Sequence, residues 1–452
     1  MSEVSQISGL QVKISNRQIL QITLPISFAI FVPQINFITN NIFLGRLGEE
    51  ALATAGITGV SYLIFTAIGI GLNNGLQALI ARRAGEARVN EIGKLFAQGV
   101  RISLAIAAMG ILIIYFVVPH FLHFAIKSET IQNKTIDFLR IRIWGLPFLY
   151  IYQMRNALLV GTNQSKFLMT GALAETITNI FFDYGFIYGK FGLPQLGFNG
   201  AAYASIIAEF TGMIVVFAVI HANGISKRFN LFKHFSWDKA TIKLILVQSS
   251  PLIFQYGVSI ISWQFFYILI EHHGTRALAI STTMRNIFGL FGISTWAFSA
   301  TANTMVSNII GQGMKDKVPE LIKKIIILSF GTGLFFCLLL NLFPGLFLSI
   351  FGQGKQFLEE AIPVVRIVST ALLIMSFSGV WLNAVIGTGN THINLAIEVI
   401  TLIFYLIYVY LVLEVFNLSI VFGWMSEWLY WTLIFVMSWL YIRSGKWKAK
   451  VI

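Results

Sequence analysis

Long apolar runs recur along the whole 452-residue chain, and they constrain its fold more than any other feature. A helix that crosses the hydrocarbon core of a bilayer needs ~20 mostly apolar residues. The sequence predicts twelve such helices, with cores at residues 19–43, 52–80, 95–119, 138–160, 167–189, 199–221, 244–270, 276–309, 322–350, 362–386, 393–414 and 419–442. The run from 102 to 118 is apolar on every side, whereas a membrane β-strand alternates over about ten residues. We therefore expect an all-α membrane protein with twelve transmembrane helices.

The composition argues against a soluble protein. Charged residues make up 11% of the chain and apolar residues 56%, against about 25% and about 45–50% in soluble domains. The single cysteine, Cys337, cannot form an intrachain disulfide, which excludes a disulfide-stapled secreted domain. A soluble enzyme and a small secreted module are both disfavoured.

The basic residues predict how the helices are oriented. Twenty of the 32 Lys and Arg residues fall in the N-terminus, the C-terminus and the connections on that same side, and eight fall in the connections on the other side. The positive-inside rule then places both termini in the cytoplasm and the protein in the plasma membrane as a multi-pass protein. The net charge of +13 is thus explained by orientation, and we expect no nucleic-acid partner. Residues 1–17 lack the pattern of a signal peptide, so the first span is expected to stay in the mature protein.

An internal repeat divides the chain at its midpoint. Three pairs of similar segments recur at offsets of 226 or 227 residues: Pro25 with Pro251, Gly48-Glu-Glu-Ala-Leu-Ala with Gly274-Thr-Arg-Ala-Leu-Ala, and Asn156-Ala-Leu-Leu with Asn383-Ala-Val-Ile. Each half would hold six helices, so both halves insert with the same orientation. They are expected to form two six-helix lobes related by a pseudo-two-fold axis along the membrane normal.

The expected domains follow from this repeat. Residues 1–222 are predicted to form the N-terminal lobe, the polar stretch 223–241 a cytoplasmic linker, and residues 242–452 the C-terminal lobe. Two such lobes leave a cavity between them, which is the architecture of alternating access. A duplicated scaffold that transports nothing remains the alternative.

Polar residues form a stripe along the fifth predicted helix. Glu175, Asn179 and Asp183 stand at positions i, i+4 and i+8, so they share one helix face. A carboxylate beside an amide in an apolar helix can bind a proton or a small hard cation. We expect Asp183 to bind a coupling ion; an internally hydrogen-bonded structural acid is the alternative. Asn40, Ser205 and Glu209 could complete the site, whereas Glu175, nearer the cytoplasmic end, has a structural role as its simpler interpretation.

Several of these segments together resemble one family. They are Asn179-Ile-Phe-Phe-Asp183, Gly200-Ala-Ala-Tyr-Ala-Ser205, Leu24-Pro25, Asn40-x-x-x-x-Gly45-x-Leu-Gly48, Ala51-Leu-Ala and Asn303-x-x-Val306-x-x-x-Ile310-Gly-Gln-Gly313. Their residues and their order resemble helices one, two, five, six and eight of the multidrug and toxic compound extrusion (MATE) transporters, of prokaryotic type. The resemblance spans almost the whole chain, including the repeat of six helices.

The resemblance implies a function and a site. MATE transporters export organic, often cationic or amphipathic compounds in exchange for Na⁺ or H⁺, so small organic substrates and the lipid bilayer are the expected partners of a monomer. By position, Asn179, Asp183 and Ser205 would form the coupling site, with Na⁺ at Asp183 as the one possible metal and no cofactor. Many prokaryotic members have an aspartate where this chain has Asn40, so paired-acid proton coupling is not expected. Residues 244–268 contain no acid, and a cation site in the second half is not expected.

Two further positions are candidates for function. Arg285 lies about ten residues into the eighth span, about 15 Å deep at 1.5 Å per residue. It would contact an anionic substrate group or neutralise Glu271 or Glu398. Pro25 in the first span frees a backbone group and is expected to act as a hinge. Arg155 is expected to extend toward the cytoplasmic interface.

Two other functions remain as alternatives. A lipid-linked oligosaccharide flippase of the same superfamily would use basic residues such as Arg285 in its cavity. A membrane-embedded enzyme would need a His/Asp or Ser/His arrangement in a large loop, and the loops here are short. No phosphate-binding loop or histidine metal motif is recognisable, so we expect no enzymatic activity.

Overall fold

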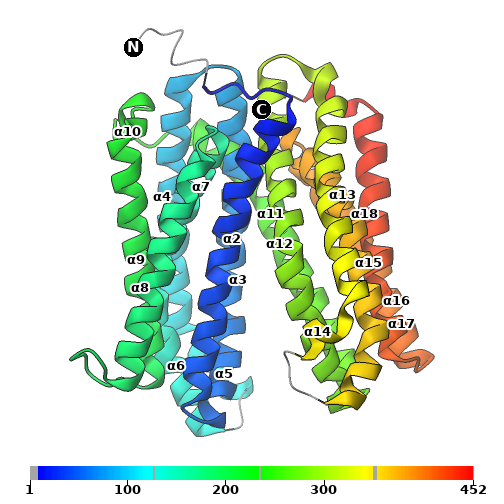
Figure 1. The fold of residues 1–452 in the computed structure, drawn as a ribbon. Coiled ribbons are helices and arrows are strands. Elements are labelled where there is room, and N and C mark those ends of the chain that lie inside the picture. The colour runs from blue at the N-terminus through cyan, green and yellow to red at the C-terminus, as the bar shows by residue number, and fades with distance from the viewer. Residues whose placement is uncertain (1–8, 126–127, 234–235, 350–353, 451–452) are drawn as a thin grey trace. The chain divides into compact units, whose positions relative to one another are not determined.

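The computed structural model of the protein describes residues 9–125, 128–233, 236–349 and 354–450, and every regular element in these ranges is a helix (Figure 1). The helices of the first half are α2 (Asn16–Gly45), α3 (Glu49–Gly85), α4 (Val89–Phe116), α5 (Val118–Ala125), α6 (Glu129–Arg142), η1 (Ile143–Gly145), α7 (Leu146–Gly161), η2 (Ser165–Phe167), α8 (Leu168–Tyr188), α9 (Phe198–Ala222) and α10 (Ile225–Arg228). Those of the second half are α11 (Lys239–Glu271), α12 (Thr275–Gly311), η3 (Lys315–Lys317), α13 (Val318–Leu342), α14 (Pro344–Ser349), α15 (Lys355–Gly387), α16 (Thr391–Tyr410), η4 (Leu411–Val415), α17 (Ile420–Trp424), α18 (Ser426–Arg443) and η5 (Lys446–Ala449).

The all-α prediction is confirmed, and each expected span coincides with helical structure. Nine helices in the described ranges are long and apolar enough to cross a membrane. The other three expected spans are the fourth, which breaks into α6, η1 and α7, and the polar helices α8 and α12. The spans that deviate from a simple apolar helix therefore include the one that carries the predicted ion site.

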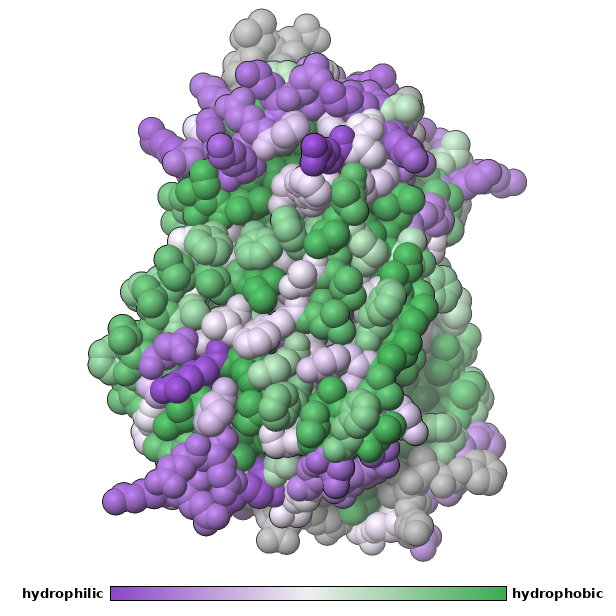
Figure 2. Space-filling model, turned by 90° about the vertical axis from the view of Figure 1, so that its right-hand side faces the viewer, coloured by the Kyte–Doolittle hydropathy of each residue, from purple (hydrophilic) through white to green (hydrophobic). Residues whose placement is uncertain are grey.

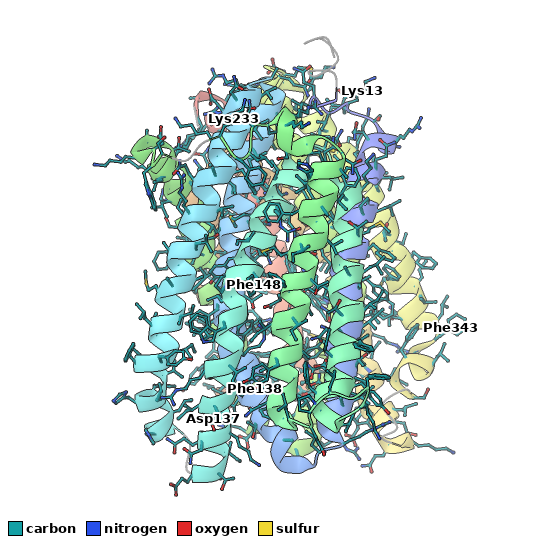
Figure 3. The ribbon with its side chains drawn as sticks, turned by 90° about the vertical axis from the view of Figure 1, so that its left-hand side faces the viewer. Lys13, Asp137, Phe138, Phe148, Lys233 and Phe343 are labelled. Atoms are coloured by element: carbon teal, nitrogen blue, oxygen red, sulfur yellow. The ribbon has the colours of Figure 1, made fainter. Side chains whose placement is uncertain are left out.

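The outer surface is that of a protein in lipid. On the face drawn in Figure 2, a mostly hydrophobic band lies between two hydrophilic ends. Large apolar side chains on α16, such as Phe404 and Ile407, are about half exposed on the protein surface. In the first half, Lys233 lies at one end of the helices and Asp137 near the other, with Phe148 between them (Figure 3). The protein is a multi-pass membrane protein.

The helices form two compact units. The first unit contains Phe28–Ser249, and the second contains Ser250–Ile452 together with Gln11–Ser27. The expected linker, residues 223–241, therefore packs with the first unit. The helices α2 and α11 are each divided between the units, after Ser27 and after Ser249. Both divisions lie within two residues of a proline, Pro25 in α2 and Pro251 in α11.

A close helix contact recurs in both units at the offset of the sequence repeat. In the first unit, a Cβ atom on Gly161 of α7 would lie 2.8 Å from Ile80 Cγ2 of α3. In the second unit, a Cβ atom on Gly387 of α15 would lie 3.0 Å from Val306 Cβ of α12. Gly387 and Val306 each follow their first-unit counterparts by 226 residues. The duplication is therefore preserved in the helix packing.

The first turns of α2 and α11 make a second repeated contact. Thr23 of α2 and Thr301 of α12 share a hydrogen bond between hydroxyl groups at 2.9 Å in the second unit. The equivalent pair in the first unit, again 226 positions away, is Ser249 of α11 and Gly75 of α3, where Ser249 occupies the space that a Cβ on Gly75 would need. The start of each divided helix thus fills the same place in the unit formed mainly by the other half of the chain.

An extended segment precedes each divided helix and is fastened to its unit. Before α2, the backbone N–H of Val12 donates to Asn308 Oδ1 at 3.1 Å, and Gln312 Nε2 donates to the Val12 carbonyl at 3.0 Å. Before α11, Gln98 Nε2 donates to the Ser236 carbonyl at 2.8 Å. These contacts hold the two entry segments against α12 and α4.

The linker also carries an ion pair, between Asp238 and Lys94 of α4. The hydrogen bond from Lys94, aided by the backbone N–H of Thr241, lowers the pKa of Asp238 to about 2. A carboxyl group whose pKa is lowered on folding stabilises the folded state above its unfolded pKa of ~3.9 and loses that effect as the pH falls toward 2. The attachment of the linker is therefore insensitive to pH in the physiological range.

The glycine contact predicts a stability difference between two alanine substitutions. We expect Gly387→Ala to destabilise the protein by about 1–3 kcal/mol, because its Cβ would lie 2.7 Å from the backbone oxygen of Asn303 and the helices must move apart. Gly289→Ala in α12 is the matched control, because nothing lies within 4 Å of its Cβ and alanine favours the helix. Thermal unfolding of the purified variants measures the difference. Equal midpoints would show that the glycine contact is not needed.

The ion pair of the linker predicts a change in protease sensitivity. We expect Asp238→Asn to increase tryptic cleavage at Lys233 and Lys239, because the linker loses its contact with Lys94. Asp238→Glu keeps a carboxylate for Lys94 and should retain protection. The ratio of cleavage in Asp238→Asn to cleavage in the unchanged protein should be constant between pH 5 and pH 9, because the pKa of Asp238 is about 2. Protection that falls within that range would contradict this assignment.

Candidate functional site

The predicted site residues of α8 and α9 meet inside the first unit. The Asn179 side chain donates to Asp183 Oδ2 at 2.9 Å and accepts from the backbone N–H of Ser205 at 3.1 Å. The Ser205 hydroxyl lies 3.4 Å from the same amide group. Asp183 is fully buried. The sequence stripe on α8 is therefore a real polar layer, and Ser205 belongs to it.

A residue that the sequence analysis did not single out, Asn36, completes this layer from α2. The Asn179 amide also donates to Asn36 Oδ1. Asn36 lies one turn before Asn40 on the same face of α2. The spacing of four residues places Asn36 and Asn40 on one helix face, so the sequence could have indicated both. Only the packing of α2 against α8 shows that Asn36 is the one that contacts Asn179.

Ring contacts further along the two helices define the place of Asn40. Phe43 of α2 lies 5.9 Å from Tyr184 and 6.0 Å from Tyr188 of α8, measured between ring centroids. Because Asn36 lies at Asn179, the two helices advance in the same direction. Asn40 lies between these two levels on α2, as Asp183 does on α8.

Two buried oxygen atoms at this level have no hydrogen-bond partner among the described residues. They are Asp183 Oδ1 and Asn40 Oδ1. The described side chains also form no ion pair with Asp183. Buried acceptors without donors are costly, and oxygen atoms are the ligands that hard cations prefer. The pair fits a proton or a small monovalent cation.

Glu209, expected as an accessory ligand, is instead part of a buried ion pair. Arg142 donates to its two carboxylate oxygens at 2.9 and 2.5 Å. The guanidinium also lies 4.0 Å from the ring centroid of Tyr62 on α3. Gly145, in the break between α6 and α7, leaves room for the pair, because a Cβ there would overlap both side chains. The break in the fourth span thus accommodates a charge pair inside the unit.

Glu175 packs against α9 within electrostatic range of Arg142 and Arg155. Its side chain packs against Gly212 of α9: a Cβ atom on Gly212 would lie 3.1 Å from the Cβ atom of Glu175. Arg142 and Arg155 both attract its carboxylate through space. The described residues form no hydrogen bond or ion pair with it.

The expectation that Arg155 extends to the interface was wrong. Its side chain is fully buried, and it donates through Nη1 to the Met213 carbonyl at 2.6 Å. The rings of Tyr152 and Phe217 lie 5.1 and 5.0 Å from the guanidinium carbon. The packing of α7 against α9 places it inside the unit, a fact that its position near the end of a predicted span did not reveal.

The second unit contains a buried acid of a different kind, Glu398 on α16. Ser259 and Tyr430 donate to its Oε1 at 2.7 and 2.6 Å, and Gln255 donates to its Oε2 at 3.2 Å. Both carboxylate oxygens are therefore supplied with donors, in contrast to Asp183.

Arg285 is not paired with an acid. Among the described residues it forms no ion pair with Glu271 or Glu398, and its guanidinium carbon lies 5.3 Å from the ring centroid of Tyr267. The described part of the chain also holds no group of three or more His, Cys, Asp and Glu residues suited to a metal ion.

Comparison with known proteins agrees with this architecture. The MatE family model matches residues 25–185 and again residues 251–411. The two matches differ by the same 226 positions as the internal repeat. The chain belongs to the MatE family, a family of membrane transporters.

Relatives and solved structures extend this result. The chain is 28% identical to "Probable multidrug resistance protein NorM" of Synechocystis over 210 residues, which cover 46% of this chain and 45% of that protein. It is 24% identical to the protein of the same name from Thermotoga maritima over 448 residues, covering 96% and 94%.

The fold is shared with solved transporters. A MOP superfamily transporter from Pyrococcus furiosus has a TM-score of 0.88 at 17% identity and covers 97% of both chains. A MATE transporter from Vibrio cholerae has a TM-score of 0.88 at 17% identity, covering 99% of this chain and 100% of that one. These structures have twelve transmembrane helices in two lobes, as the sequence predicts for this chain.

The buried pair predicts a non-additive effect on stability. We expect Arg142→Met alone to cost about 3–5 kcal/mol, because it leaves Glu209 charged and without a partner. The double variant Arg142→Met, Glu209→Leu should recover most of that loss, because it removes both charges. A double-mutant cycle on thermal unfolding of the purified protein gives the coupling. Additive losses would mean that the two side chains act independently.

Proposed function

We propose that the protein is a secondary active antiporter that exports organic, cationic or amphipathic compounds in exchange for Na⁺ or H⁺, with Asp183 as the coupling group. The single observation that supports this most is the buried Oδ1 of Asp183, which has no hydrogen-bond partner among the described residues. The names of the relatives, probable multidrug resistance proteins, support the same class of cargo.

Asp183 is the acid of the first unit that has a buried oxygen without a donor among the described residues. Glu209 is neutralised by Arg142 through two hydrogen bonds. Glu175 is attracted by Arg155 and Arg142. Asp183 has the through-space attraction of Arg142 but no ion pair. A buried carboxylate without a counter-charge is expensive, so this group gains most from binding a proton or a cation.

The asparagines would supply the remaining ligands. Asn40 offers an unpartnered oxygen, and Asn179 and Ser205 orient the carboxylate. Asn40 in place of an acid makes the site a single-carboxylate site, suited to one monovalent charge. When the cation leaves, Asp183 is again a buried anion, which raises the free energy of this arrangement of α2 and α8. Ion binding and the conformation of these two helices are therefore linked.

Helix α2 would carry this change to the rest of the protein. Its outer part bears Asn36 and Asn40 in the first unit, and its first turns pack in the second unit through Thr23. Pro25, two residues before the division, would be the hinge between these parts. Ion occupancy would therefore bias the angle of α2 and drive alternating access.

The orientation and location form part of the proposal. Both termini would lie in the cytoplasm, because the positive-inside rule favours the side rich in Lys and Arg. The protein would act as a monomer in the plasma membrane. Arg285, which has no acid partner in the described residues, would be the first position to test if the cargo proved to be anionic.

The decisive experiment is drug efflux from proteoliposomes under separately imposed Na⁺ and proton gradients. We expect Asp183→Asn to lower gradient-driven efflux by about 100-fold or more, since the driving charge has no binding site. The variant should still fold, because asparagine preserves the bond from Asn179. The matched control is Glu398→Gln, a buried acid of the second unit whose oxygens are already supplied with donors.

Two results would contradict the proposal. Unchanged coupled efflux by Asp183→Asn would remove this residue from the mechanism. A greater loss in Glu398→Gln than in Asp183→Asn, with both proteins folded, would move the coupling site to the second unit.

A further inference from the structure

Arg155 has an unused donor in the interior of the first unit. The side chain is fully buried, Nη1 donates to the Met213 carbonyl at 2.6 Å, and Nε donates to the Ile151 carbonyl at 3.4 Å. Nη2 is buried and has no acceptor among the described residues. No described carboxylate forms an ion pair with Arg155.

Such an arrangement is costly unless it is used. A buried guanidinium that is satisfied only by backbone carbonyls keeps its full charge in an apolar surrounding. The rings of Tyr152 and Phe217 offset part of that cost. The open donor therefore needs an anionic partner in another state of the protein.

Glu175 is the acid placed to be that partner. Its side chain passes Gly212 on α9, and the next residue of α9, Met213, accepts the hydrogen bond from Arg155. Glu175 and Arg155 therefore lie against the same turn of α9 from two different helices, α8 and α7. Attraction between their charges acts in the present arrangement as well.

Two basic side chains act on Glu175, those of Arg142 and Arg155, and Arg155 is the one that is not already paired with an acid among the described residues. Tyr62 comes from α3, Arg142 from α6, Tyr152 from α7 and Glu209 from α9. Arg142 is occupied by both oxygens of Glu209. Nη2 of Arg155, by contrast, is buried and has no acceptor among the described residues.

Glu175 also has a place on the path of an ion. It follows Asp183 on one face of α8 at a distance of eight residues, or about 12 Å. It lies on the side of Asp183 that leads to the start of α8. Glu175 is the next acid on this face of α8 in that direction.

We propose that Arg155 is a built-in counter-cation that takes over the Glu175 carboxylate when the coupling cation leaves the first unit. While the cation is at Glu175, the positive charge of Arg155 repels it and shortens its stay. Once the cation has gone, Glu175 turns to Nη2 of Arg155, and this ion pair neutralises the carboxylate and disfavours return of the cation. The inference rests on the proposed function, because it assumes that a cation moves through this unit.

Cation titrations of the purified protein in lipid nanodiscs test this inference. Tryptophan fluorescence is followed during a Na⁺ titration at fixed pH and a pH titration without Na⁺. The chain has ten Trp residues, so the signal reports the response of the whole protein. The titration to which the unchanged protein responds identifies the cation, and the midpoints of the variants are then compared.

The expected shifts have opposite signs. Arg155→Gln should lower the cation concentration at the midpoint by about tenfold or more, since a repelling positive charge is removed, and it should slow efflux because release is slower. Glu175→Gln should raise the midpoint, because Arg155 then acts on the cation unopposed. Arg155→Lys should stay within about threefold of the unchanged protein, since it keeps the charge.

Two controls separate this role from a structural one. Arg101→Gln removes another guanidinium that binds a backbone carbonyl, that of Ser236, and should leave the midpoint unchanged. The double variant Arg155→Gln, Glu175→Gln should have a midpoint near that of the unchanged protein, since the two opposite effects cancel. A purely structural role of Arg155 would alter thermal unfolding without shifts of opposite sign.

Several outcomes would overturn the inference. These are a folded Arg155→Gln variant with an unchanged midpoint, shifts of equal sign in the two single variants, or a double variant that keeps the shift of Arg155→Gln. If Arg155→Gln does not fold, an unchanged midpoint in Glu175→Gln is equally decisive. Asp183→Asn distinguishes this failure from that of the proposed function: a normal cation response in that variant would overturn the coupling role of Asp183 itself.

Discussion

The requirement that a charge inside an apolar helix bundle be balanced within that bundle governs the first unit. Arg142 and Glu209 meet it by pairing, and the chain breaks its fourth span at Gly145 to make room for them. Asp183 does not meet it, since one of its oxygens has no hydrogen-bond donor among the described residues. This contrast between an acid that is balanced and one that is not is the reason why we propose Asp183, and not Glu209, as the coupling group.

The two units treat their buried acids differently although they arose by duplication. The helix contacts at Gly161 and Gly387 are retained at the same offset, so the framework is shared. In the second unit, however, Glu398 receives hydrogen bonds on both oxygens from α11 and α18. That acid joins three helices and needs no further ligand. The two units therefore share their helix packing but differ in their buried polar residues and in the hydrogen bonds that these residues form.

The sequence alone was sufficient for the helices and the repeat, because span length and offset are properties of the chain itself. It also predicted that Asp183, Asn179 and Ser205 lie together, since a polar stripe in an apolar helix is visible without a partner. It failed where the answer depended on a neighbouring helix. The pairing of Arg142 with Glu209, the choice of Asn36 beside Asn40, and the burial of Arg155 all follow from packing between segments far apart in the chain, and no local pattern encodes them.

The division of α2 and α11 near Pro25 and Pro251 has a consequence for the origin of the fold. Each half of the gene encodes a unit that lacks its own opening turns and receives them from the other half. A half-length ancestor would thus have been incomplete as a single chain, and two copies exchanging their first segments would have formed the smallest stable molecule. Fusion of the copies would then have turned a swapped dimer into one polypeptide, and the linker at residues 223–241 would mark the place where they were joined.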